Sequence, residues 1–327
     1  MNKELETALA EIRKNYGEGA VLVMDNEHIP AIAKTPTGVL PLDIILGGGY
    51  PVGRVIEIFG NESSGKTTLA LTAIAQQQAL GKDCAFIDAE HALDPVYAKN
   101  LGVQLDKLVI SQPENGEMGL EIAEALIRSG AISLLVVDSV SALVPKAIID
   151  GEMGDQHIGL LARLMSKAMQ KLIGIASQTG CTVIFINQLR EKVGTYGNPE
   201  ITTGGRALKF YASVRIDIRK KEAIKKDGNV IGNVVLVKTA KNKTYPPFKE
   251  AKFKIMYGTG VDEFDCVIDY AITANLIEKA GAWYTFKGER FQGKDNVTKY
   301  LRENTDSYVE LKEQVFNLAS QGQIALE

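Results

Sequence analysis

A glycine-rich turn between an apolar segment and a helix-forming segment constrains this chain more than any other feature. Residues Gly60–Thr67 match the pattern GxxxxGK(S/T) in full. The apolar run Arg54–Phe59 predicts a strand before the turn, and Lys66–Leu80 predicts a helix after it. The glycines let the backbone curl so that successive N–H groups point at phosphate oxygens, and the positive end of the helix adds to that field. The sequence therefore predicts a nucleotide-phosphate site.

Three side chains carry the chemistry expected at the phosphate end of this site. Lys66 is a point charge that reaches the β- and γ-phosphates, and the Thr67 hydroxyl is a ligand for Mg²⁺. Asp138 closes the apolar run Leu134–Val137 and is expected to hold the same Mg²⁺ through water, although taken alone it is equally well placed as a helix N-cap. The predicted nucleotide-binding residues of the loop are Gly60, Asn61, Glu62, Ser63, Ser64, Gly65, Lys66, Thr67 and Thr68.

A carboxylate just after the next predicted strand, Asp83–Asp88, is the candidate for activating water. Glu90 faces the nucleotide crevice at the carboxyl edge of that strand, where it can accept a hydrogen bond from the attacking water and orient it. Asp88 and His91 are the rival candidates, although a histidine in such a loop is more often a hydrogen-bonding residue than a catalyst.

Strands and helices alternate from about Gly38, which indicates an α/β fold. Continuous β-branched runs such as Leu134–Asp138 and Thr182–Asn187 are typical of strands buried on both faces, so the central sheet is predicted to be mostly parallel. Later strands without long helices between them predict an antiparallel extension of this sheet, at Ser213–Arg219, Asn233–Lys238 and Ala251–Met256.

The two ends of the chain differ from this pattern. Met1–Tyr16 predicts an amphipathic helix, which either packs on the body of the protein or docks on a neighbouring subunit. Near Val261 the pattern changes again, and helices are predicted at Asp262–Leu276 and Asn296–Gln321, with a small hairpin between them. We expect Val261–Glu327 to form a separate small α/β domain.

Composition excludes several classes of protein. The chain has 327 residues, 45% of them hydrophobic and 24% charged, as in ordinary globular proteins. The longest strongly apolar stretch, residues 131–137, is far shorter than the ~20 residues of a membrane span. Three scattered cysteines fit a reducing cytoplasm, and a net charge of −3 restricts any nucleic-acid site to a local patch. We therefore expect a cytoplasmic protein with no membrane partner.

Eight motifs in order along the chain resemble the bacterial RecA recombinase family, including members encoded by phages or mobile elements. The motifs span Gly60–Leu69, Phe86–Pro95, Leu134–Val140, Gly151–Asp155, Phe185–Gln188, Gly197–Glu200, Thr203–Gly205 and Ala207–Arg215. The resemblance implies an N-terminal helix and linker for protomer docking (1–37), a RecA-like P-loop NTPase core with two DNA-binding loops (38–260) and a small C-terminal α/β domain (261–327).

The resemblance also implies an activity. Such proteins are ATP-dependent homologous recombinases that use ATP and Mg²⁺, polymerise as helical filaments on single-stranded DNA, and catalyse homology search and strand exchange with double-stranded DNA. Their ATPase is stimulated by DNA, and they act in DNA repair and the SOS response. A self-cleaving repressor is a further candidate partner.

Some site residues are predicted by the resemblance alone. Gln188 resembles the sensor of the γ-phosphate, and Lys241 and Lys243 resemble a pair that reaches the neighbour's ATP and acts with Glu90 and Lys66 in catalysis. Without the resemblance, these two lysines would be read as a solvated strand edge. The residues that resemble those around the adenine are Asp94, Tyr97 and Tyr257.

Two segments resemble the family's DNA loops. The first is about Gly151–Gly159, followed by Arg163, and the second is about Arg190–Arg206. Basic residues there neutralise phosphates, and glycines supply mobility. Ile158 and Val193 match residues that insert between groups of bases, although Val193 also fits simple anchoring of the loop. The predicted DNA-binding residues are Ile158, Arg163, Arg190, Lys192, Val193, Gly204, Gly205 and Arg206.

Three other functions share part of this pattern. A RecA-like ring-forming DNA motor or helicase has the same core, and it is the main alternative. A small-molecule kinase would need an acceptor pocket and an arginine-bearing lid, and a DNA-coating protein would use ATP only as a switch. The sequence ends at Gln321–Glu327 without the acidic tail common in the family, so we expect weaker autoinhibition of DNA binding.

Overall fold

The computed structural model describes residues 2–21, 23, 32–152, 157, 159–191 and 200–321. It divides the chain into two units, residues 1–33 and 34–327. The first unit carries helix α1 (Lys3–Tyr16) and the short 3-10 helix η1 (Glu18–Ala20). Helix α1 begins where the Asn2 side chain accepts a hydrogen bond from the Glu4 N–H, and it ends at Gly17.

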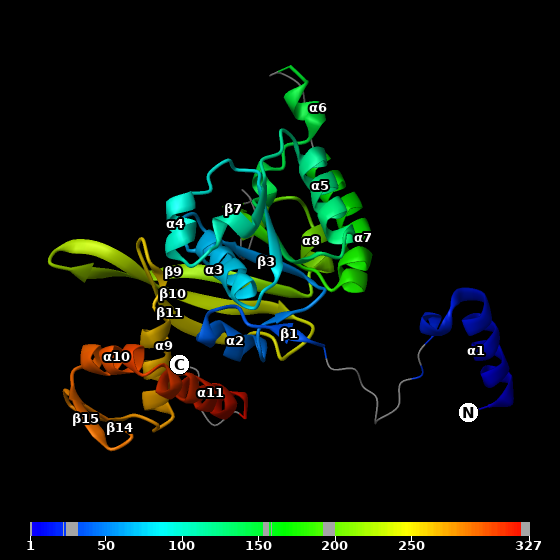
Figure 1. The fold of residues 1–327 in the computed structure, drawn as a ribbon. Helices are drawn as coiled ribbons and strands as arrows, with labels where there is room; N and C mark the ends of the chain where they lie inside the picture. Colours follow the sequence, from blue (N-terminus) through cyan, green and yellow to red (C-terminus); the bar gives the residue numbers. More distant parts are fainter. Residues whose placement is uncertain are drawn as a thin grey trace. The chain divides into compact units, whose positions relative to one another are not determined.

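In the described part of the second unit, one ten-stranded sheet carries the fold (Figure 1). Its order is β12-β11-β10-β9-β3-β7-β6-β4-β5, and β8 pairs with β7. The parallel strands of its centre are β3 (Val55–Gly60), β4 (Asp83–Asp88), β5 (Leu108–Ser111), β6 (Ile132–Asp138), β7 (Thr182–Glu191) and β9 (Val214–Lys226). The antiparallel strands are β8 (Glu200–Thr202), β10 (Asn229–Asn242), β11 (Glu250–Met256) and β12 (Gly260–Val261).

Both faces of this sheet are covered, which explains why its central strands are mostly apolar. Ile56 and Ile58 of β3 belong to a core with α3, whereas Val55 belongs to the core on the other face with α5 and α7. Side chains alternate between the faces of a strand, so a strand that serves both cores is apolar at nearly every position, and the buried Glu57 of β3 is an exception. The helices in the part of the chain that carries this sheet are α2 (Leu40–Leu46), α3 (Lys66–Ala79), α4 (Pro95–Asn100), α5 (Gly116–Arg128), α6 (Lys146–Ile149), α7 (Leu160–Thr179) and α8 (Ala207–Tyr211). The same part also contains two 3-10 helices, η2 (Leu105–Lys107) and η3 (Val140–Ala142), and a small sheet of β1 (Lys34–Thr35) and β2 (Tyr50–Pro51).

The C-terminal part builds a third core. Its elements are α9 (Glu263–Thr273), β13 (Glu278–Ala280), β14 (Trp283–Phe286), β15 (Glu289–Gln292), α10 (Lys294–Glu303) and α11 (Thr305–Ser320). This core also takes in Leu40 and Ile44, which lie on α2. The single helix predicted over Asn296–Gln321 is wrong: the helix is broken at Asn304, whose φ of −118° and ψ of 74° are not helical.

The predicted fold class, an α/β protein with a mostly parallel central sheet, an N-terminal helix and a small C-terminal part, is confirmed. One detail differs, because β9 pairs with β3 in parallel and the antiparallel extension begins only at β10. Among the described residues, no helix combines the length and apolar character that a membrane crossing requires.

Candidate functional site

The predicted phosphate loop connects the carboxyl end of β3 to the first turn of α3. Gly65 precedes the helix with a φ of +101°, and a Cβ there would lie 2.4 Å from Ile255 Cδ1. A Cβ on Gly60 would lie 2.2 Å from the main-chain oxygen of Ile218. The contact with main chain leaves no room for a side chain at Gly60, and the positive φ favours glycine at Gly65, so the fold itself accounts for both glycines of the motif.

Lys66 folds back over this loop. Its Nζ donates to the main-chain oxygens of Gly60, at 3.2 Å, and Asn61, at 2.8 Å. Burial lowers the pKa of this amine, while the nearby carboxylates of Asp138 and Glu90 oppose the shift. The ammonium therefore lies where the loop would wrap an anion, held by carbonyl groups that phosphate oxygens can replace.

Thr67 and Asp138 meet at the end of two neighbouring elements. The Thr67 hydroxyl donates to Asp138 Oδ2 at 2.7 Å. Burial raises the pKa of Asp138 to about 6, and the charges of Glu90 and Asp88 add to the shift. A hydroxyl and a carboxylate oxygen are ligands that suit Mg²⁺ with nucleotide phosphates. The buried Ser64 hydroxyl has no hydrogen-bond partner among the described residues, so the loop also offers a free donor to a ligand.

A cavity of about 270 Å³ extends from the loop toward β10 and β11. Of the three predicted adenine residues, Tyr97 and Tyr257 line it, whereas Asp94 accepts from the N–H groups of Val96 and Tyr97 as the N-cap of α4. The Tyr97 hydroxyl lies 2.9 Å from Thr68 Oγ1. The lining includes residues that the sequence did not indicate, namely Asn233, Val235 and Ile255.

Glu90 and Gln188 meet at the carboxyl edge of the sheet. Gln188 Nε2 donates to Glu90 Oε1 at 3.0 Å, and the Ser139 hydroxyl donates to the same oxygen. Arg190 Nη2 in turn donates to Gln188 Oε1 at 3.4 Å. These contacts connect the candidate water-activating carboxylate to the start of the second predicted DNA segment. The sequence did not indicate Ser139.

The two rivals of Glu90 have other surroundings. Asp88 is buried and accepts from the N–H groups of Ala92 and Leu93 and from Gln112 Nε2, so it holds the loop that follows β4. His91 is exposed, and its φ is +55°.

Lys241 and Lys243 lie toward the opposite end of the sheet. Lys241 is level with Arg215, which is level with Glu57, three residues before Gly60 on β3. At ~3.3 Å per residue, this places Lys241 roughly 10 Å back along the strands from the start of the loop. Lys243 lies further back, where its main-chain N–H donates to the main-chain oxygen of Ser213. Lys241 Nζ donates to the main-chain oxygens of Lys209, at 2.9 Å, and Phe210, at 2.8 Å, and burial together with nearby cations lowers its pKa to about 8.

The predicted DNA-binding residues are described in part. Arg163 is exposed in the first turn of α7, Arg190 is exposed near the end of β7, and Arg206 is exposed just before α8. Gly204 and Gly205, which were expected to supply mobility, have positive φ angles and lie close against neighbouring elements. Ile158, Lys192 and Val193 lie outside the described residues.

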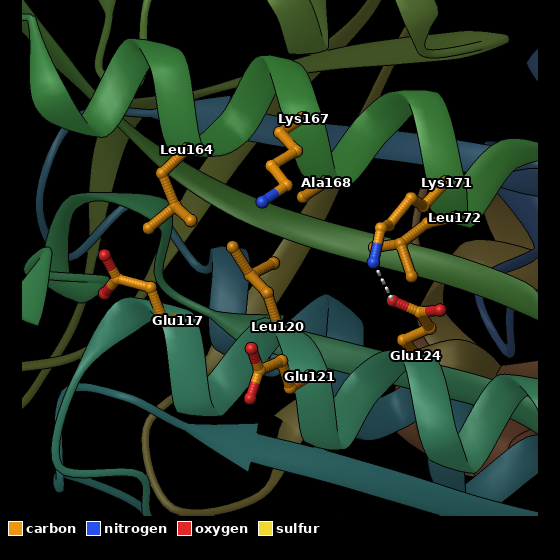
Figure 2. A pocket seen from close by; sticks show the side chains of 9 residues that line it. All are labelled: Glu117, Leu120, Glu121, Glu124, Leu164, Lys167, Ala168, Lys171 and Leu172. Carbon is orange, nitrogen blue, oxygen red and sulfur yellow. Dashed lines mark hydrogen bonds and ion pairs between the residues drawn. The ribbon is translucent and has the colours of Figure 1, made fainter.

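A second cavity, of about 80 Å³, lies between α5 and α7 (Figure 2). Acidic side chains of α5 face lysines of α7 across it, and Lys171 Nζ lies 3.1 Å from Glu124 Oε2. It shares no residue with the cavity beside the phosphate loop, so we assign it no part in the phosphate chemistry.

Family comparisons identify the chain's relatives. The family model of the RecA N-terminal domain matches residues 3–262, and that of the RecA C-terminal domain matches residues 265–320. The chain belongs to the RecA family. Protein RecA of Citrifermentans bemidjiense is 56% identical over 319 residues, covering 96% of this chain and 94% of the relative. Protein RecA of Acinetobacter baumannii is 52% identical, covering 100% of this chain and 95% of the relative.

The solved structures agree with this assignment at the level of the fold. The crystal structure of the RadB recombinase matches with a TM-score of 0.52 at 23% identity, covering 69% of this chain and 97% of that chain. Membership of the RecA family makes the chain an ATP-dependent recombinase that binds nucleotide and DNA, and the ring-forming motor is not favoured. It likewise implies a magnesium-dependent ATPase that assembles into filaments.

Proposed function

We propose that this chain polymerises on single-stranded DNA and hydrolyses ATP at the boundary between neighbouring copies, with DNA stimulating the hydrolysis. The observation that carries this proposal is the run of contacts from Glu90 through Gln188 to Arg190. It gives one side chain, Gln188, a contact both with the catalytic edge and with the start of a DNA segment.

One copy supplies the nucleotide grip. Residues 60–68 wrap the phosphates, Lys66 neutralises their β and γ charge, and Tyr97, Tyr257 and Asp94 surround the adenine. Thr67 and Asp138 hold Mg²⁺, which when bound supplies positive charge that offsets the developing negative charge of the phosphoryl group. The support for this assignment is the 2.7 Å contact between Thr67 and Asp138 and the unpartnered Ser64 hydroxyl, as far as the described residues go.

The chemistry is completed by both copies. Glu90 accepts a hydrogen bond from water and directs it at the γ-phosphate, and Gln188 moves from Glu90 to that phosphate. Lys241 and Lys243 of the next copy add positive charge where the transition state spreads its negative charge. The support for a contribution in trans is the position of these lysines back along the strands from the loop of their own chain.

DNA is held by two segments. Arg163, Arg190 and Arg206, with Lys192, neutralise phosphates of the single strand, Ile158 and Val193 insert between groups of bases, and Gly204 and Gly205 shape the return of the chain. Base edges stay free for pairing with an incoming duplex, so recognition is delegated to base pairing and strand exchange follows. Residues 1–37 dock each copy on the next in this proposal, 38–260 form the core, 261–327 form the small C-terminal domain, and a self-cleaving repressor is a further partner.

The test is ATP turnover measured with and without single-stranded DNA at fixed Mg²⁺, alongside electron microscopy of the same samples. We expect DNA to raise turnover and open helical filaments to form on the strands. Turnover that is unchanged by DNA would contradict the proposal, and closed rings would favour the motor instead.

A further inference from the structure

A cluster of polar side chains lies inside the central sheet, behind the nucleotide site. Glu57 of β3 and Asn187 of β7 are both 0% exposed, and Arg215 of β9 is 8% exposed. Arg215 forms a buried ion pair with Glu57, and its guanidinium also lies 4.4 Å from the centre of the Phe59 ring. Buried polar groups cost free energy unless they are hydrogen-bonded, so such a cluster persists only where its members satisfy one another.

Asn187 uses every hydrogen-bonding position of its side-chain amide. Its Nδ2 donates to Glu57 Oε1 at 2.8 Å and to the main-chain oxygen of Thr203 at 3.1 Å. Its Oδ1 accepts from the main-chain N–H of Gln188 at 2.9 Å and from the Thr203 hydroxyl. A primary amide has two donors and two acceptor lone pairs, so its capacity is filled by partners on β3, β7 and the segment that follows β8.

Thr203 stands where the second predicted DNA segment returns to the body. The next residue, Gly204, has a φ of +79°, and a Cβ there would lie 2.7 Å from Val140 Cγ1. A Cβ on Gly205 would lie 2.6 Å from the Cβ of Ala162. Val140 follows Asp138 by two residues and Ala162 precedes Arg163, so the returning chain is wedged between the metal side of the site and the first turn of α7.

We propose that Asn187 is a positioning residue that transmits the position of Gln188 to the return of the second DNA segment through Thr203. This inference rests on the proposed function, because it takes Gln188 as the γ-phosphate sensor. The Gln188 N–H and the Thr203 hydroxyl bind the same oxygen. A shift of the main chain at Gln188 therefore changes the acceptor that Thr203 meets.

The buried Glu57 carboxylate holds the Asn187 amide in one orientation. If the amide of Asn187 turned over, its oxygen would face Glu57 and its NH₂ would face the Gln188 N–H. Both contacts would be repulsive inside the sheet, where neither the Glu57 carboxylate nor the Gln188 N–H can hydrogen-bond to water instead. Glu57 therefore fixes one edge of the amide, and a displacement at Gln188 has to be taken up on the Thr203 side.

The experiment removes only the Thr203 hydroxyl. Thr203→Val keeps the size of the side chain and loses the donor, whereas Thr203→Ser keeps the hydroxyl. The Kd of a single-stranded oligonucleotide is measured for the full-length proteins with ADP and with a non-hydrolysable ATP analogue, both with Mg²⁺. The readout is the Kd with ADP divided by the Kd with the ATP analogue. This ratio reports how strongly the nucleotide controls DNA binding.

We expect Thr203→Val to lower this ratio roughly fivefold, the effect of one lost hydrogen bond in the network. Thr203→Ser is expected to retain the ratio, and the Kd of the analogue without DNA is expected to stay within about twofold in both variants. Thermal unfolding checks that each variant is folded. Where Thr203→Val does not fold, Thr203→Ala is measured in the same way.

A merely structural role gives a different result. DNA binding would then weaken by the same factor with both nucleotides, and an unchanged ratio in a folded variant would overturn the inference. A wild-type ratio near one would remove the proposed control by ATP itself, and the inference with it. If the wild-type ratio is well above one and the Thr203→Val ratio is the same, the proposed function stands and only the role of Asn187 is rejected.

Discussion

The two ends of the central strands differ in what their charged side chains contact. At the carboxyl end, Thr67 bonds to Asp138 and Gln188 bonds to Glu90, so groups that suit a metal and a water are already gathered. Back toward the amino end, Lys241 donates to main-chain oxygens at the end of α8. The chain thus places acceptors for metal and water at one end and two further cations toward the other.

The separation of these charges gives a physical reason why hydrolysis would depend on assembly. Phosphoryl transfer needs positive charge around the γ-phosphate in addition to the metal. One chain supplies Lys66 beside its own loop, while Lys241 lies about three strand residues further back and Lys243 lies further back than Lys241. In the proposed filament the two ends meet at each boundary between copies, so an isolated copy holds nucleotide without the full complement of charge.

Turnover should fall most when the proposed nucleotide site is changed. Lys66→Ala removes the charge that we propose lies nearest the β- and γ-phosphates, and we expect turnover to fall by at least about 10³-fold. ATP turnover and nucleotide binding measure this, with Lys82→Ala, an exposed lysine beyond α3, as the control. Unchanged turnover would refute the assignment of the phosphate loop.

A smaller loss of turnover is expected at Glu90, the side chain proposed to orient water. Glu90→Gln keeps the size of the side chain but removes its charge, and we expect turnover to fall about 10²-fold while ATP and DNA binding persist. Single-turnover hydrolysis and oligonucleotide binding separate the two. Glu114→Gln, at an exposed position, is the control. Loss of ATP binding in Glu90→Gln would mean that the residue is structural.

Mixing two inactive variants tests whether the ends act together across copies. Lys66→Ala and Lys241→Ala should each be impaired alone. In a random one-to-one filament roughly a quarter of the boundaries would combine an intact loop with an intact lysine, since each is present in half the copies. We therefore expect turnover of the mixture to recover to about a quarter of the wild-type value. A mixture no more active than its components would show that Lys241 acts within its own chain.

The charge of Lys241 gives a pH dependence. The pKa of this amine is lowered to about 8, so its charge is present below that value and is lost as the pH rises through it. The guanidinium of Lys241→Arg stays protonated. Normalised to pH 7, wild-type turnover at pH 9 should be up to roughly tenfold below that of Lys241→Arg. Profiles that superimpose would contradict the assigned role.

The weakest change is expected in the proposed DNA segment, which begins at the carboxyl end. In the proposed complex Arg190→Ala removes one phosphate contact, so the slope of log K against log salt for single-stranded DNA should decrease in magnitude by about 0.7. Arg128→Ala, on the exposed side of α5, is the control. An unchanged slope in Arg190→Ala would move the DNA site elsewhere.

The sequence predicted those parts of the molecule that depend on neighbours along the chain. The loop at Gly60–Thr67 and the parallel strands follow from local pattern, and the fold class is confirmed. The polar cluster escaped notice because Asn187 and Arg215 lie 130 and 158 residues from Glu57, their common partner. A signal was present, since Glu57 interrupts an otherwise apolar buried strand. The break in the helix at Asn304 was not predicted because the apolar spacing continues on both sides of it.

Helix α2 has a consequence for dissecting this protein. Its seven residues are all buried, with Leu42, Ile45 and Leu46 in the core beside α3 and Leu40 and Ile44 in the core of the C-terminal part. Truncating the chain after β12 would remove the residues that bury Leu40 and Ile44 and would expose an apolar patch to solvent. A truncated ATPase fragment should therefore aggregate in solution unless Leu40 and Ile44 are replaced by polar residues.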